Sequence, residues 1–292
     1  MSEPKRHHYV PQTYLRGFAD NEKVWVYDKL ENKYYSPSLE NVAVISNYYS
    51  LVYEGEKNND IERYFAQMES DIKPIIEKIE NKERPTQLEK DKLALFIAYQ
   101  FVRVPSYENQ NRDSMNQLME IMKEWDIPEE KHEVKTPDFL PSDTPGISAR
   151  ELHDNLTELL DSDTKFKNQH LEMVVNSGVQ FAANFLHLEW RYCFAPENYS
   201  FITTSSPFVM TFIEGKKPPA MGFLVRGVIK VFPITSKVCL LMLDDHEENL
   251  IATISGKSVD EINLALASRS DRYLFHNDKE VLEKLAKEIK HD

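Results

Sequence analysis

The chain has 292 residues, 41% hydrophobic and 28% charged, which is typical of a globular protein long enough to bury a sizeable core. Its formal net charge of −13 disfavours broad binding to duplex nucleic acid, because such binding needs a basic face that replaces phosphate counterions. The chain has only 8 glycines and contains neither GxGxxG nor GxxxxGKS/T, which argues against a Rossmann or P-loop nucleotide site.

The sequence shows no secretory signal, and apolar runs such as VCLLML have the length of a strand rather than of a membrane span. The two cysteines, Cys193 and Cys239, lie in apolar strand-like segments and are expected to be buried, reduced thiols. We therefore expect a cytoplasmic protein that does not associate with membranes. No motif identifies a metal, a cofactor or a partner, so the sequence leaves all three unknown.

Two adjacent histidines, His7 and His8, stand directly before a Val-Pro step and the start of an apolar helix. Adjacent residues of an extended segment point to opposite sides, so one imidazole is available for metal ligation or proton transfer while the other packs. The alternative is that both imidazoles bind backbone groups where this arm docks. Pro11 suits a first helical position, which predicts a short helix over residues 11–18, followed by a hairpin or meander.

After Asn59 the apolar residues recur three and four apart, which predicts an amphipathic helix that Pro74 should kink. Next, Thr86 and Glu89 have the spacing of a capping box. Residues 93–101 are apolar almost all round, so we expect this second helix to be central. The stripe of the first helix comprises Ile61, Phe65, Met68, Ile72, Ile75, Ile76 and Ile79.

Gln100 and Arg103 are three residues apart and share a face of this otherwise apolar second helix. Both need partners, because an unpaired buried polar or charged group is costly. Arg103 could hold a substrate carboxylate or phosphate in a bidentate fork, or it could pair internally with Glu62 or Glu69. The sequence leaves both readings open.

Four prolines in residues 127–147 predict a long loop or a lid rather than a domain boundary. The helical pattern then resumes up to about residue 187, with an interruption near residues 162–165. β-branched and aromatic runs separated by turns predict strands over about 188–257. A helix with Ser258 as its N-cap, a short strand or edge segment in DRYLFHND, and a charged helix from Asp278 complete the chain.

Two polar segments in the C-terminal third are further candidates for a binding site. Thr204, Ser205 and Ser206 follow a strand and precede a proline, a pattern that suits anion binding but is also ordinary turn chemistry. Asn263 shares a helical face with Ser270, near Arg269 and Arg272. Arginines at a helix C-terminus complement the helix dipole without any further role.

Runs of helices followed by runs of strands predict an α+β fold rather than an alternating α/β fold. We expect one domain over residues 1–292. In it, a helical N-terminal two-thirds, at about 58–187, packs with a mainly antiparallel C-terminal sheet at about 188–257.

The segments HHYVPQTYLRGFAD, VWVYDK, FIAYQFVRVP, FITTSSPF, VFPIT and INLALASRSDRYLF follow one another along nearly the whole chain. Through them the sequence resembles the bacterial domain-of-unknown-function family 4238, whose members open with a similar His-His, Tyr, Val-Pro-Gln, Tyr-Leu, Phe signature. The family pattern in the middle usually reads Thr-Ser-Asp-Asn-Pro, and here Ser205 replaces its acidic residue. If that residue is a metal ligand or a general base in relatives, this chain is impaired or uses another carboxylate.

These candidates support three hypotheses. The first is a hydrolase of nuclease or phosphoesterase type, in which His7 or His8 is a ligand or general acid/base, Arg103 stabilises anionic charge and Gln100 orients substrate or water. Its substrate-binding residues would be Thr204, Ser205, Ser206 and Asn263. The second is a binding or regulatory protein without turnover that recognises a small anion, a peptide or a protein partner. In the third, the same polar residues form an internal network that stabilises the fold.

Overall fold

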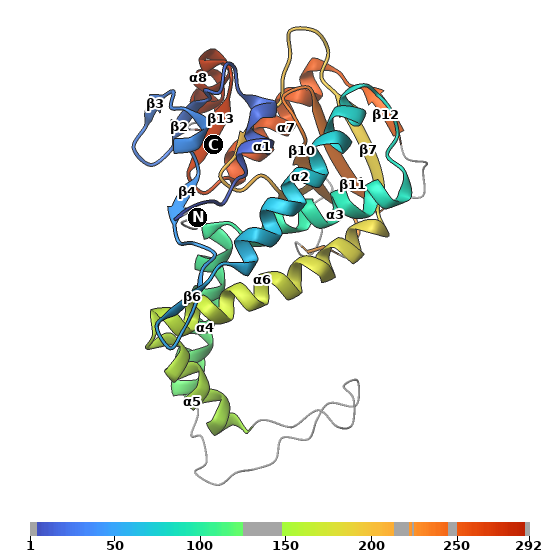
Figure 1. Ribbon diagram of the computed structural model, residues 1–292. Helices are drawn as coiled ribbons and strands as arrows, with labels where there is room; N and C mark the ends of the chain where they lie inside the picture. Colours follow the sequence, from blue (N-terminus) through green and yellow to red (C-terminus); the bar gives the residue numbers. More distant parts are fainter. Residues whose placement is uncertain (1–4, 125–147, 213–221, 224, 245–249, 290–292) are drawn as a thin grey trace.

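Helices fill the middle of the chain and sheets form from its two ends, which confirms the α+β fold class (Figure 1). The computed structural model describes residues 5–124, 148–212, 222–223, 225–244 and 250–289. The loop or lid predicted at 127–147 therefore lies outside the described residues.

The larger sheet follows the helices in sequence and has the strand order β12-β7-β11-β10-β9. Every neighbouring pair is antiparallel except β12 with β7, so the sheet is mainly antiparallel as predicted. Cys239 and Cys193 are register partners on β11 and β7, and both thiols are buried. The strands are β7 (Glu189–Phe194), β9 (Val209–Phe212), β10 (Val228–Pro233), β11 (Val238–Leu243) and β12 (Leu250–Thr253).

The smaller sheet joins the two ends of the chain in the order β3-β2-β13-β8. The segment DRYLFHND supplies its strand β13, which is antiparallel to β2 on one side and to β8 on the other. The predicted short strand is therefore present, and it lies inside the sheet rather than at its edge. The strands are β2 (Trp25–Asp28), β3 (Lys33–Tyr35), β8 (Thr203–Thr204) and β13 (Tyr273–His276).

The N-terminal arm is held in place by short elements. Its strand β1 (Arg6–His8) pairs antiparallel with β4 (Val44–Ser46), with His7 opposite Ile45. The helix predicted over 11–18 is present as α1 (Gln12–Leu15) and a 3-10 turn (Arg16–Phe18). A second 3-10 turn (Leu39–Asn41) and the hairpin of β5 (Leu51–Tyr53) with β6 (Glu56–Asn58) follow.

Helix α3 (Gln87–Val102) is buried along most of its second half, as its apolar sequence predicts, and begins with the capping box of Thr86 and Glu89. Helix α6 (Asp163–Leu186) packs along it so closely that a Cβ atom on Gly178 would clash with the Tyr99 ring. On the other side α2 (Asp60–Glu80), which continues through Pro74, buries its apolar stripe. Helix α3 is thus the centre of the helical layer.

Helices α4 (Pro105–Lys123) and α5 (Ala149–Leu160) project away from both sheets (Figure 1). Their contact is a separate small apolar cluster. The predicted interruption between α5 and α6 is present, and Ser162 caps α6 by accepting a hydrogen bond from the Lys165 N–H. The cluster consists of Met119, Met122 and Leu156.

Two helices close the described chain. Helix α7 (Gly256–Arg269) is capped by Ser255, whose hydroxyl accepts a hydrogen bond from the Ser258 N–H. The prediction of Ser258 as the N-cap was wrong, because the first turn already begins at Gly256. Helix α8 (Lys279–Glu288) is capped by Asp278, as its sequence suggests. Among the residues that the structure describes, no helix is both long and apolar enough to cross a membrane.

Candidate functional site

A small cavity lies where the end of α3, the start of α4, the loop after β8 and the end of α7 meet. Its volume is about 180 Å³. Aromatic side chains form part of its wall, and its polar lining is supplied by Gln100, Ser106, Gln110, Ser206, Arg269 and Asp271. Three of the segments that the sequence singled out therefore meet at one cavity.

Gln100 is the buried polar residue of this cavity. Its side chain is fully buried, and neither its Oε1 nor its Nε2 atom has a hydrogen-bond partner within the described residues. Leaving a buried polar group unpaired costs about 1–3 kcal/mol of stability. The amide thus keeps one donor group and one acceptor group that no described protein atom uses.

A chain of hydroxyl groups runs from α4 to Asp271. The Oγ atoms of Ser106 and Ser206 lie 2.8 Å apart, and Ser206 Oγ donates to Asp271 Oδ1 at 3.2 Å. Ser205 Oγ donates to the same oxygen at 2.5 Å and accepts a hydrogen bond from the Tyr273 N–H at 3.1 Å. Asp271 therefore places a carboxylate next to Ser205. Ser205 is the residue that replaces the acidic residue of the Thr-Ser-Asp-Asn-Pro pattern.

The cavity also has two opposite charges at its exposed side. Arg269 and Asp271 both line it, and both side chains are exposed. Arg269 makes no ion pair within the described part of the chain, and the second oxygen of Asp271, Oδ2, accepts no hydrogen bond there. Both groups are therefore available to a bound molecule.

A second, larger groove of about 570 Å³ also has Asp271 in its lining. It is lined by Tyr9 of the arm, by Tyr35 on β3 and by Arg272 beside β13. Unlike Arg269, Arg272 is already paired, because its Nη2 lies 2.8 Å from Asp28 Oδ2. Its arginine is therefore less available to a bound molecule than Arg269 of the cavity.

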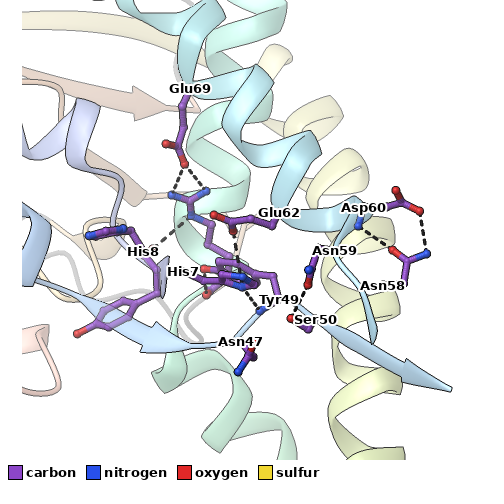
Figure 2. A network of polar contacts seen from close by, with 12 residues as sticks. His7, His8, Asn47, Tyr49, Ser50, Asn58, Asn59, Asp60, Glu62 and Glu69 are labelled. Atoms are coloured by element: carbon purple, nitrogen blue, oxygen red, sulfur yellow. Dashed lines mark hydrogen bonds and ion pairs between the residues drawn. The ribbon is translucent and has the colours of Figure 1, made fainter. Parts of the chain in front are cut away.

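His7 and Arg103 belong to a buried polar network. Figure 2 shows His7 next to Tyr49 and Glu62 in this network, with Glu69 further along α2. His7 Nδ1 accepts a hydrogen bond from the Tyr49 N–H at 2.9 Å, and the two rings are stacked. Both terminal nitrogens of Arg103 donate to Glu69 Oε1 at 3.0 Å, and its Nε donates to the Tyr9 carbonyl at 3.2 Å. Arg103 thus makes the internal pair with Glu69 that the sequence left open.

Two carboxyl groups of α2 face this network, and burial raises the pKa of each. The pKa of Glu62 rises to about 7, although the positive charge of Arg103 opposes the shift. Glu62 Oε2 lies 3.9 Å from His7 Nδ1. The pKa of Glu69 is also raised by burial, against the hydrogen bonds from Arg103. The network therefore contains a carboxyl group that titrates near neutral pH.

The other predicted site residues lie apart from the cavity. His8 is half-buried at the surface, with its Nε2 atom 3.1 Å from Gln12 Nε2, and burial lowers its pKa. The Thr204 hydroxyl accepts a hydrogen bond from the Ser206 N–H. Asn263 binds the backbone of residues 200 and 202. These contacts hold the backbone around β8 in place.

Reasoning from the sequence missed Asp271 and Ser106 as site residues. Ser106 follows Pro105 at the start of α4, and Asp271 follows the arginine-containing end of α7. Both positions read as ordinary helix ends. The only feature of the sequence that pointed to a site here is the pair of opposite charges, Arg269 and Asp271, close to a predicted strand. No group of three or more His, Cys, Asp or Glu residues that could hold a metal ion occurs in the described ranges.

Comparison with known protein families gives a match that covers nearly the whole chain. A family model described as "Protein of unknown function (DUF4238)" matches residues 6–280. No curated protein and no solved structure matches the chain.

Proposed function

The chain belongs to the DUF4238 family, a family of unknown function, and from this premise we propose that it binds a small polar molecule in the cavity next to Gln100. This is the binding alternative that the sequence suggested. It does not require turnover.

The observation that carries the proposal is the Gln100 amide. A fully buried amide without a partner among the described residues destabilises the fold, and such groups in native proteins have a reason, such as a bound molecule or a functional role. A ligand that hydrogen-bonds the amide would offset this cost. The hydroxyl groups and the Asp271 carboxylate add further polar contacts in the same cavity.

Arg103 has a positioning role in this proposal. It ties the end of α3 to Glu69 on α2 and to the carbonyl of Tyr9 in the arm. Gln100 lies one turn earlier on the same helix, so these bonds fix the helix end that lines the cavity. His7 contributes indirectly by holding the segment around Tyr49, whose hydroxyl donates to the Arg103 carbonyl.

A hydrolase is the second candidate, and one observation favours it. Ser206 Oγ donates to the Asp271 carboxylate inside the cavity, which is the hydrogen bond that a hydroxyl nucleophile and its base require. Gln100 would then orient the substrate, as the sequence suggested. In this proposal Ser206→Ala abolishes turnover but keeps ligand binding, whereas a binding protein without turnover yields no product in any variant.

Gln100→Met tests the proposed function. Methionine has a similar volume but no hydrogen-bonding amide. In chemical denaturation without ligand, the variant should therefore be more stable than the natural protein by about 1–2 kcal/mol. Ligand-observed NMR with mixtures of amino acids, nucleobases, nucleosides and sugars should find compounds that bind the natural protein and lose binding in the variant.

The matched control is Gln87→Met, at the exposed start of the same helix, which should change neither stability nor binding by more than a few tenths of a kcal/mol. A Gln100→Met protein that is clearly less stable than the parent would show that the amide is paired inside the protein. A library in which no compound depends on Gln100 would also count against the proposal.

A further inference from the structure

We propose that the molecule bound in the cavity is a free α-amino acid with a carboxamide side chain, L-glutamine or L-asparagine. This inference rests on the proposed function and adds the chemical class of the ligand.

The cavity is small. Its volume of about 180 Å³ is below the range of about 300–1,000 Å³ that is usual for sites of drug-sized ligands. A single amino acid or a nucleobase is therefore a better match than a nucleotide or an oligosaccharide. Phe101, Tyr107 and Phe208 supply an apolar wall for the methylene groups of a short side chain.

The buried end of the cavity selects a particular polar group. Gln100 presents an acceptor, Oε1, beside a donor, Nε2, and both are unpaired among the described residues. A carboxamide carries the complementary donor and acceptor on one planar edge, so it satisfies both atoms at once. A carboxylate has acceptors only and would leave Oε1 unpaired against a negative charge. The amide therefore distinguishes glutamine from glutamate.

The exposed side of the cavity selects a zwitterion. The Arg269 guanidinium has no ion pair in the described part of the chain and can bind an α-carboxylate through two hydrogen bonds. The Asp271 carboxylate, with Oδ1 already bound to the two serines, can accept hydrogen bonds from an α-ammonium group at Oδ2. A neutral nucleobase would leave both charges unused.

Isothermal titration calorimetry with the full chain tests this assignment. L-Glutamine or L-asparagine should bind, and L-glutamate or L-aspartate should bind at least tenfold more weakly, since a site built to hydrogen-bond a polar group rejects analogues without it. Glutaramate, which lacks the α-ammonium group, and 4-aminobutanamide, which lacks the α-carboxylate, should each also lose roughly tenfold or more in affinity. The affinities of L-glutamine and L-asparagine, compared with each other, report which side-chain length fits the cavity.

Variants of Arg269 and Gln100 test the contacts to the α-carboxylate and to the carboxamide separately. Arg269→Met should weaken L-glutamine binding but leave the already weak binding of 4-aminobutanamide unchanged, because that compound has no carboxylate. Arg226→Met is a control on another exposed arginine that should leave both affinities unchanged. Gln100→Met should weaken the binding of both L-glutamine and 4-aminobutanamide, because both carry the carboxamide.

Two results would overturn the inference while leaving the proposed function intact. One is equal affinity for L-glutamine and L-glutamate. The other is Gln100-dependent binding of uracil, included as a nucleobase probe, together with no binding of either carboxamide amino acid. If no compound in any arm depends on Gln100, the proposed function fails together with the inference.

Discussion

Glu62 is the residue whose protonation the fold controls near neutral pH. Burial raises its pKa from 4.5 to about 7, with Arg103, Glu69 and His7 as its charged or titratable neighbours. The folded protein therefore holds a proton on Glu62 that the unfolded chain releases above pH 4.5. The resulting stabilisation is complete below pH 4.5 and is lost as the pH rises to about 7.

Glu62→Gln should remove this dependence. Relative to the natural protein, the variant should gain stability as the pH is raised from 5 to 8, by roughly 3 kcal/mol for a shift of this size. Urea denaturation at several pH values measures the difference. Glu80→Gln, on the same helix but exposed, should show no such trend. A constant difference between Glu62→Gln and the parent would mean that Glu62 stays ionised throughout.

Gln100 and Arg103 show how much of the site the sequence could predict. Both were recognised as polar residues on an apolar helix that must find partners. The sequence could not predict which residue would be satisfied internally, because Glu69 and Tyr9 belong to other elements. Asp271 was missed for the same reason, since the pairing of β13 with β8 brings it to the serines.

At the scale of elements, Arg103 joins α3 to α2 and to the N-terminal arm. Arg103→Met should destabilise the protein by about 3 kcal/mol, because Glu69 and the Tyr9 carbonyl lose a buried donor. Thermal and chemical denaturation measure the loss. In a double-mutant cycle with Glu69→Gln, the two effects should be strongly non-additive.

The matched control is an exposed ion pair between the same two helices. Lys92 Nζ lies 3.1 Å from Asp71 Oδ2, and the two side chains are 45% and 40% exposed. Lys92→Met should therefore cost less than about 1 kcal/mol. Equal losses for Lys92→Met and Arg103→Met would contradict a special role of the buried pair.

The sequence predicted those helices and strands whose boundaries depend only on residues close to them in the chain. The capping box of α3, the break between α5 and α6 and the strands of the larger sheet follow from spacing, turn residues and β-branched runs. The pairing of β13 with β2 was not predictable in this way. Its register, with Phe275 opposite Val26, joins segments at the two ends of the chain and leaves no periodicity in either.

At the scale of the whole molecule, we expect the chain to unfold as one unit. A single apolar cluster contains Tyr9, Phe96, Trp190 and Phe275, which come from the arm, the helices and both sheets. Leu274 on β13 is fully buried in a second apolar cluster. Its position between β2 and β8 makes it a suitable probe of cooperativity.

Leu274→Ala should lower the stability of the whole protein by about 2–5 kcal/mol, as expected for a fully buried leucine. The transition should remain single, with tryptophan fluorescence and far-UV circular dichroism giving the same midpoint. Separate midpoints, with the helical signal unchanged, would instead divide the chain into two domains.

The position of β13 inside the smaller sheet has a consequence for biosynthesis. Strand β2 leaves the ribosome before its partner β13, which is made only after more than two hundred further residues, so β2 must wait with an unpaired edge. Such distant pairing slows folding and prolongs the exposure of apolar surface. We therefore expect newly made chains to complete this sheet only after β13 has been made and to need protection from aggregation until then.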